Sequence, residues 1–244
     1  MALSGARNET ADQLKSLLSL SNHSNQQIFD MQSSYLKILS ELNSSVALNV
    51  ANKVYSKEGY VLKKEFTDNL AKYYESEAQL LNFGDAQGSA KTINDWVANK
   101  TNDKIKNLLS PDLFDELTRL VLVNAVYFKG KWLNPFDKAN TYKEDFTLRD
   151  GSVQKVDMMK LLSKKFLFKI NPAGLMACTC EIPYIGEKIS MTIILPHEGI
   201  KIEDVEKNIN HDILKEVFER NSRPGKVHLY LPRFKLDLKT EVIV

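Results

Sequence analysis

The sequence RLVLVNAVYFKGKWLNPFDKANT, residues 119–141, contains an apolar run around which we expect the fold to be built. Between residues 120 and 128 the one strongly polar side chain is Asn124, and the valines and aromatic residues favour an extended backbone. An apolar run that does not alternate is typical of a strand covered on both faces, in the middle of a large sheet. Gly130 and Pro135 end the strand. The stretch therefore predicts a central strand with neighbouring strands on both sides.

Asn124 is the exception within this run, because a buried side-chain amide without hydrogen-bond partners costs roughly 1–3 kcal/mol. Two interpretations follow. In the first, Asn124 makes an ordinary structural hydrogen bond inside the sheet. In the second, its amide forms a polar contact between strands that must sometimes separate. The sequence alone leaves both open.

The other expected elements mix helices with antiparallel hairpins. Helical spacing of apolar residues predicts a helix over residues 28–42 with one inward face, made of Ile28, Met31, Tyr35, Ile38, Leu39 and Leu42. Asn210 is placed to cap a later helix, and residues 185–188 are typical of a hairpin connection. Because the regular β-α alternation of a doubly wound fold is missing, the expected class is α+β.

The strand expected over residues 227–238 changes its apolar phase at Pro232-Arg233. Apolar residues lie at odd positions before this point and at even positions after it: Val227, Leu229 and Leu231, then Phe234, Leu236 and Leu238. A shift of one residue exchanges the buried and exposed faces of a strand, and proline removes a backbone donor. We therefore predict that the strand bends, or passes from one sheet to another, at this point.

Composition limits the class of protein. A length of 244 residues suits one large domain or two small ones, and 43% hydrophobic residues can bury a sizeable core. With 33 basic and 31 acidic residues, the chain has no charge excess typical of binding to nucleic acid or to an anionic membrane. No apolar run approaches the ~20 residues of a membrane helix. We therefore expect neither nucleic acid nor a membrane as a partner.

The sequence carries no recognisable catalytic or metal motif. The four histidines lie in different expected elements and lack metal-ligand spacing: His23, His197, His211 and His228. No nucleophile elbow, Walker loop or dinucleotide-binding glycine motif occurs. Cys178 and Cys180 point to the same face of one expected strand, which suits neither a disulfide between them nor a structural zinc site. We therefore expect no enzyme, no cofactor and no metal.

A set of residues with specific spacing resembles the central block of the serpins, which holds the third strand of their large sheet and the segments after it. The matching residues are NAVYFKGKW (124–132), PF (135–136), Thr141, Phe146 and Met158-Met159. Similar matches run from MALSGAR (1–7) to LPRF (231–234), so the resemblance covers essentially the whole chain. It implies that residues 1–244 form a single partial serpin domain with several mixed and antiparallel sheets and surrounding helices. We expect this domain to lack the family's N-terminal helices and its C-terminal reactive-loop region.

The resemblance implies inhibition of a serine endopeptidase. Serpins offer an exposed reactive loop as bait, and after cleavage the loop inserts as a new strand into the large sheet with the protease covalently trapped. Asn124, Trp132 and Thr141 match family positions that control where this sheet opens, and the helix around Trp96 matches one that lies across the sheet. The expected partner is a target protease. The reactive-site bond is expected beyond Val244, so this chain alone is expected to be inactive.

A second possibility is a serpin that does not inhibit but acts as a carrier, chaperone or storage protein. The reactive loop and its hinge distinguish the two, and we expect both to lie outside this sequence. Some serpins bind a glycosaminoglycan through the helix that matches residues 28–42. Because Lys37 is the one basic residue in this helix, a glycosaminoglycan is not an expected partner.

Four acceptor patterns for N-glycosylation are present, at Asn8, Asn22, Asn43 and Asn99. Chance alone would supply about two such patterns in a chain of this composition. The expectation of an extracellular, secreted glycoprotein therefore depends mostly on what is usual in the resembled family, and a cytoplasmic protein is the alternative. MALSGARNET has no apolar segment long enough for a signal peptide. This carries little weight, because the resemblance places Met1 inside the domain.

Overall fold

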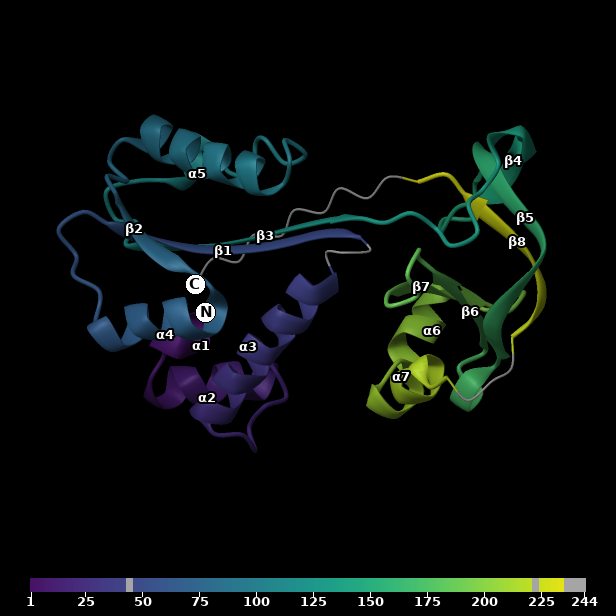
Figure 1. The fold of residues 1–244 in the computed structure, drawn as a ribbon, viewed down its shortest axis with the longest axis horizontal. Helices are drawn as coiled ribbons and strands as arrows, with labels where there is room; N and C mark the ends of the chain where they lie inside the picture. The colour runs from purple at the N-terminus through teal and green to yellow at the C-terminus, as the bar shows by residue number, and fades with distance from the viewer. Residues whose placement is uncertain (43–45, 221–223, 235–244) are drawn as a thin grey trace. The chain divides into compact units, whose positions relative to one another are not determined.

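The computed structural model describes residues 1–42, 46–220 and 224–234, and Figure 1 shows its fold. The chain divides into two compact units, Met1–Lys129 and Gly130–Val244. The first unit is a sheet between helices, and the second is a group of antiparallel strands around the long strand β5 (Val153–Ile170), accompanied by short helices. The single partial domain over residues 1–244 stays a prediction.

In the first unit, β1 lies between the other two strands of the described sheet, which has the order β2-β1-β3. The bounds are β1 Ala47–Lys57, β2 Glu77–Leu81 and β3 Leu120–Lys129. β1 is parallel to β2 and antiparallel to β3. Helix α5 (Ala86–Lys100) lies on one face of this sheet (Figure 1). The other face carries the helices α1 (Ala2–Gly5), α2 (Asn8–Leu17), α3 (Asn25–Glu41) and α4 (Lys64–Tyr74).

Alternating side chains of β1 contact the helices on opposite faces of the sheet. Val54 and Tyr55 are both 0% exposed. Val54 belongs to a core cluster with Leu70 of α4, whereas Tyr55 belongs to another with Val97 of α5. Successive side chains of a strand point to opposite faces. β1 is therefore the strand of this unit that is covered on both sides.

β3 forms where the sequence predicts it, but its burial is not that of a central strand. Val123 and Ala125 are buried in the cluster under α5, whereas Asn124 between them is exposed. Among the described residues β3 pairs with β1 alone, so it lies at an edge of the sheet. Within the described residues the predicted neighbour is present on one side, and a neighbour on the other side stays a prediction. An apolar run indicates extended backbone, but it does not say how many strands surround it.

Helix α3 buries the expected residue Ile28, but most of its buried face differs from the expected one. Its buried side chains are Ile28, Phe29 and Leu36. The Phe29 ring lies 5.3 Å from the Tyr73 ring of α4, so α3 contacts the rest of the unit through this side. Three of the expected inward residues are instead exposed: Met31, Tyr35 and Ile38. Apolar residues occur on both sides of α3, and the sequence therefore did not determine which side is buried.

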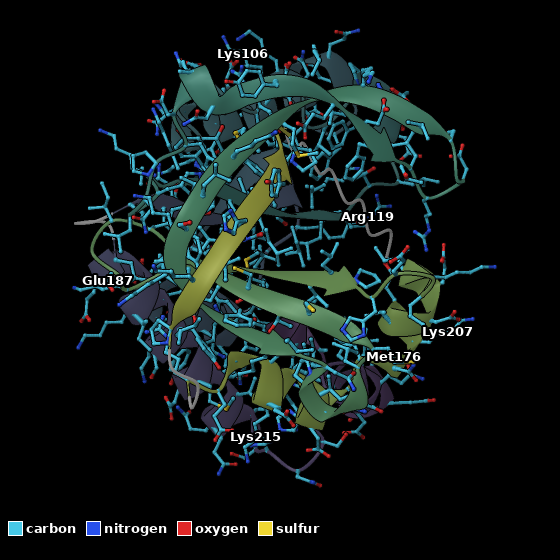
Figure 2. The ribbon with its side chains drawn as sticks, turned by 90° about the vertical axis from the view of Figure 1, so that its right-hand side faces the viewer. Lys106, Arg119, Met176, Glu187, Lys207 and Lys215 are labelled. Atoms are coloured by element: carbon cyan, nitrogen blue, oxygen red, sulfur yellow. The ribbon has the colours of Figure 1, made fainter. Side chains whose placement is uncertain are left out.

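The second unit is built on the long strand β5 (Val153–Ile170). Along its length it pairs in turn with β4 (Thr141–Thr147), β8 (Gly225–Pro232) and β6 (Ala177–Pro183), and β6 pairs with β7 (Ser190–Pro196). Figure 2 shows the yellow strand β8 lying against β5. The pairing of these two strands is irregular between Leu161 and Lys164, which marks a bulge. β5 therefore takes part in two groups of strands.

Short helices complete the second unit. Helices α6 (Ile202–Asn208) and α7 (His211–Phe218) each bury a valine against the start of β6. The predicted cap of α7 is confirmed, because the Asn210 side chain accepts a hydrogen bond from the Ile213 backbone N–H at 3.0 Å. Single 3-10 turns occupy Pro111–Leu113 in the first unit, and Lys138–Asn140 and Pro172–Gly174 in the second.

Strand β8 contains the residues before the predicted change of face at Pro232-Arg233. Leu229 and Leu231 are buried and Tyr230 between them is exposed, as the odd-position pattern predicts. The strand ends at Pro232, and Phe234 is exposed. The remaining residues of the pattern, Leu236 and Leu238, lie outside the described residues, so the exchange of faces stays a prediction.

The mixture of helices with largely antiparallel strands confirms the expected α+β class. Within the described ranges, no helix has both the length and the apolar character needed to cross a bilayer.

Candidate functional site

The outer edge of β3, which no described strand covers, is the feature of the first unit that bears most directly on function. β3 pairs with β1 over ten residue pairs, from Ala47 opposite Lys129 to Ser56 opposite Leu120. On the other side of β3, the described chain places no further strand. Leu120, Val126 and Phe128 are exposed by 40% or more, although all three are large apolar residues. An edge of this kind accepts an added strand.

Asn124 lies on β3 on the face opposite α5. Its Nδ2 donates a hydrogen bond to Asn52 Oδ1 of β1 at 2.9 Å, and Asn52 Nδ2 donates to the Tyr74 carbonyl of α4 at 3.1 Å. The expected buried position is wrong, because Asn124 is exposed at the edge of the sheet. The interpretation as a structural hydrogen bond is confirmed. Its role in strand separation stays a prediction.

Helix α5 covers the opposite face of the same strands. Ile93 and Val97 are 0% exposed and pack with Val123 of β3 and Tyr55 of β1. The Trp96 ring meets the Tyr55 ring edge to face, with centroids 6.5 Å apart and planes at 85°. The helix around Trp96 therefore lies across the sheet, as the resemblance implies. Helix α5 therefore packs on β3 as well as on β1.

Sequence reasoning missed Lys53, a lysine that is buried beneath α5. Its Nζ forms an ion pair with Glu77 of β2 at 2.8 Å. The hydrogen bond from Lys53, and then its positive charge, lower the pKa of Glu77. Burial raises the pKa of Tyr55, and the Glu77 charge adds to the rise. The available signal was a lysine between Ala51 and Tyr55 on the apolar face of a strand.

Trp132 and Thr141 belong to the second unit, whereas Asn124 belongs to the first. The Trp132 ring stacks on the Tyr184 ring, with centroids 4.2 Å apart and planes at 14°. The backbone on both sides of Trp132 is bonded to the end of β6 and its loop, since Leu133 N–H donates to the Pro183 carbonyl at 2.9 Å. Thr141 is the first residue of β4, opposite Met159 of β5. The sheet-opening role of all three residues stays a prediction.

The glycosylation candidates lie on exposed positions where the structure describes them. Asn8 starts α2, Asn22 precedes α3, and Asn99 lies near the end of α5; all three are exposed. The Thr101 hydroxyl of the Asn99 pattern is buried and donates to the Val97 carbonyl at 2.8 Å. Asn43 lies outside the described residues. Glycosylation stays a prediction at all four.

The two cysteines have the properties of strand residues that pack. Both thiols are free, and Cys180 packs against the core cluster of β5, β6 and β8. Burial, together with the nearby Glu181 charge, raises the pKa of Cys180 to about 11. A thiol with a raised pKa is a poor nucleophile. Over the parts of the chain that the structure describes, no three His, Cys, Asp or Glu side chains lie together as metal ligands would.

Comparison with known proteins identifies the family. A family model described as "Serpin (serine protease inhibitor)" matches residues 1–243. The chain belongs to the serpin family. Human Serpin I2 is 36% identical to this serpin over 238 residues, which are 97% of this chain and 58% of Serpin I2. Ipis-1 of Ixodes persulcatus is 38% identical over 240 residues, 97% of this chain and 62% of Ipis-1. This serpin therefore spans about three fifths of the length of these relatives.

Solved serpin structures agree with the fold. The Manduca sexta serine protease inhibitor (serpin)-12 is similar with a TM-score of 0.86 and 28% identity, covering 95% of this chain and 63% of that one. Ovalbumin from emu (Dromaius novaehollandiae) has a TM-score of 0.86 at 26% identity, covering 96% and 64%. The structure "Cleaved Serpin 42Da" has a TM-score of 0.80 at 36% identity, covering 96% and 61%. The resemblance predicted from the central block is thereby confirmed.

Proposed function

We propose that this serpin acts in its full-length protein as an inhibitor of a serine endopeptidase. The reactive loop of the full-length protein would be cleaved by the protease and would then insert as a strand beside β3. The observation that carries the proposal is the outer edge of β3, along which no strand pairs in the described part of the chain, in a member of a family described as serine protease inhibitors. In this role the protein is consumed by its target and is not an enzyme, and it needs no cofactor.

The physical basis of insertion is strand addition. A strand that pairs with β3 gains backbone hydrogen bonds along the edge. It also covers exposed apolar side chains such as Val126, which is 50% exposed. The hydrogen bond between Asn124 and Asn52 also supports the proposal. It joins β3 to β1 and so fixes their register while a new strand pairs with the outer edge of β3. Trp132 and Thr141 match family positions that control the same opening.

The proposed partner is a target protease, and no glycosaminoglycan is needed because α3 carries Lys37 as its one basic residue. The proposed location is extracellular, supported by the exposed positions of Asn8, Asn22 and Asn99. A secreted protein would lose apparent mass when its N-linked glycans are removed enzymatically. Retention in the cytoplasm without glycans would contradict the extracellular location.

The direct test is protease trapping. The full-length protein and the 244-residue chain are incubated separately with trypsin-like, chymotrypsin-like and elastase-like proteases. Covalent complexes that survive denaturing electrophoresis are expected from the full-length protein, while the shorter chain is the negative control. Trapping by the shorter chain would show that the reactive loop lies within it. No complex from the full-length protein, together with ligand binding, would favour a carrier.

A further inference from the structure

Lys53 places an ammonium group beneath α5. The residue is 7% exposed, and its neighbours on the same face of β1 are Ala51 and Tyr55. Lysine is almost never buried to this extent unless it is paired. Its partner is Glu77, the first residue of β2, which lies opposite Lys53 in the parallel register. The Glu77 side chain is itself 77% exposed, so the ion pair covers one side of the ammonium group.

Two aromatic rings cover other sides of the same ammonium group. The Lys53 Nζ lies 5.5 Å from the Tyr55 ring centroid and 5.7 Å from the Trp96 ring centroid. A cation within about 6 Å of an aromatic face is attracted by the ring, and the attraction is larger when the cation is desolvated. Trp96 is the member of this group that belongs to α5. The ammonium group therefore links β1, β2 and α5.

The other contacts between α5 and the sheet are mainly apolar. Ile93 and Val97 bury side chains in the core cluster with Tyr55 and Val123. One polar contact lies at the end of the helix, where Asn49 Nδ2 donates to the Lys100 carbonyl at 3.3 Å. The burial of apolar surface is non-directional and selects no particular partner group. The contact of Lys53 with Trp96, by contrast, forms only when the indole ring lies over the Lys53 position of β1.

We propose that Lys53, Glu77, Tyr55 and Trp96, together named the ammonium clamp, hold α5 on the sheet and set how readily α5 moves aside for an inserting strand. The inference rests on the proposed function, because insertion beside β3 is what requires α5 to move. Lys53 is in this sense a positioning residue, which acts through Trp96. Each displacement of α5 breaks the contact of the ammonium group with the indole ring.

The first test measures amide hydrogen exchange of residues 86–100 in the full-length protein. Lys53→Met keeps the length of the side chain and removes its charge, whereas Lys53→Arg keeps the charge. We expect exchange of α5 to become about two- to fivefold faster in Lys53→Met and to stay close to the original rate in Lys53→Arg. The control is Lys91→Met, which removes a lysine of α5 that pairs with Asp95 in the same helix.

A double-mutant cycle separates the ring contact from simple packing. Lys53→Met is measured again in a Trp96→Leu background, where its effect is expected to shrink to less than half. An equal acceleration in both backgrounds would show that the indole ring plays no part, and the clamp would be refuted. Unchanged or slower exchange in Lys53→Met would also refute it, since an apolar side chain would then hold α5 as well as the ammonium group does.

The second test connects the clamp to inhibition. It uses a protease with which the original protein gives both covalent complex and cleaved free inhibitor. Because α5 would move aside sooner, Lys53→Met is expected to raise the ratio of complex to cleaved inhibitor at least twofold. Faster exchange with an unchanged ratio would contradict a role in insertion. If the original protein traps no protease at all, the proposed function fails, and the exchange measurements still decide whether the clamp exists.

Discussion

At the scale of residues, two asparagines connect the strands of the first unit. Asn124 makes its hydrogen bond to Asn52, and Asn52 makes a second one to the Tyr74 carbonyl. Sequence reasoning found Asn124, because one amide in an apolar run needs a partner. It did not find Asn52, since an asparagine in an alternating strand is ordinary. The exposure of Asn124 was also missed, because burial depends on strands that are distant in sequence.

Asn124→Ala is expected to loosen the pairing of β3 with β1 modestly. One hydrogen bond at an exposed position contributes about 0.5 kcal/mol, at the low end of the usual range. Asn52→Ala removes both bonds and should cost about 1 kcal/mol or more. Amide exchange of β1 and β3 measures the two effects. If Asn124→Ala accelerated amide exchange more than Asn52→Ala does, the predicted order of the two effects would be wrong.

The carboxylate of Glu77 makes the contact of β2 with β1 sensitive to acid. Its pKa is lowered from the ordinary 4.5 by the hydrogen bond from Lys53, then by the Lys53 charge, with Lys100 adding to the effect. A carboxylate whose pKa is lower in the folded state than in the unfolded state stabilises the fold when the pH is above its unfolded-state pKa. This stabilisation is lost as the pH falls through its folded-state pKa.

Exchange of the β2 amides should therefore rise, after correction for intrinsic rates, as the pH falls below 4.5. Glu77→Gln should exchange faster at neutral pH and lose most of this dependence. Glu75→Gln, two residues before the first residue of the strand, is the control. A Glu77→Gln protein that keeps the full acid dependence would assign the effect to another group.

At the scale of elements, local signals predicted the helices and strands better than their surroundings. The cap at Asn210 and the extended backbone of β3 follow from neighbouring residues, and the structure confirms both. The buried face of α3 does not follow, because apolar residues lie on both its sides and Phe29 contacts Tyr73 from a helix much later in the chain. Short-range chemistry specifies an element, while long-range packing selects its buried face.

Helix α5 offers a matched pair of substitutions. Asp85 caps its start, with Oδ1 accepting from the Gly88 N–H at 2.9 Å. Asp85→Ala should lower the stability of the helix by about 1 kcal/mol and speed amide hydrogen exchange in the first turns of α5 roughly fivefold. Asp95→Ala removes an exposed carboxylate of the same helix that pairs with Lys91, and should cost about 0.3–0.5 kcal/mol. Equal effects of the two substitutions would argue against capping.

At the scale of the whole molecule, family membership followed from the sequence because the motif residues of the central block have specific spacing. The edge position of β3 among the described strands did not follow, since no local pattern distinguishes an edge strand rich in valine from a buried one. The clamp around Lys53 was also out of reach, because its members come from three elements brought together by the fold.

The 244-residue chain is expected to bind a hydrophobic dye. Several large apolar residues are exposed by 64% or more: Val61, Leu17, Leu117, Ile170 and Leu195. Such dyes fluoresce on exposed apolar surface. We expect severalfold stronger fluorescence from this chain than from the full-length protein at equal molar concentration, because longer relatives have more chain to cover such residues. Equal fluorescence would show that these side chains are exposed in both.

The pairing of β1 with β3 also affects how the protein is made on the ribosome. Asn52 and Asn124 are 72 residues apart, whereas Lys53 and Glu77 of the β1–β2 contact are 24 residues apart. At about 5–20 residues per second, β1 waits roughly 4–14 s for β3 but about 1–5 s for β2. Assembly of this sheet during translation therefore starts with β2 on β1. During the remaining wait, the edge of β1 that β3 later occupies can be bound by a chaperone or by a neighbouring nascent chain.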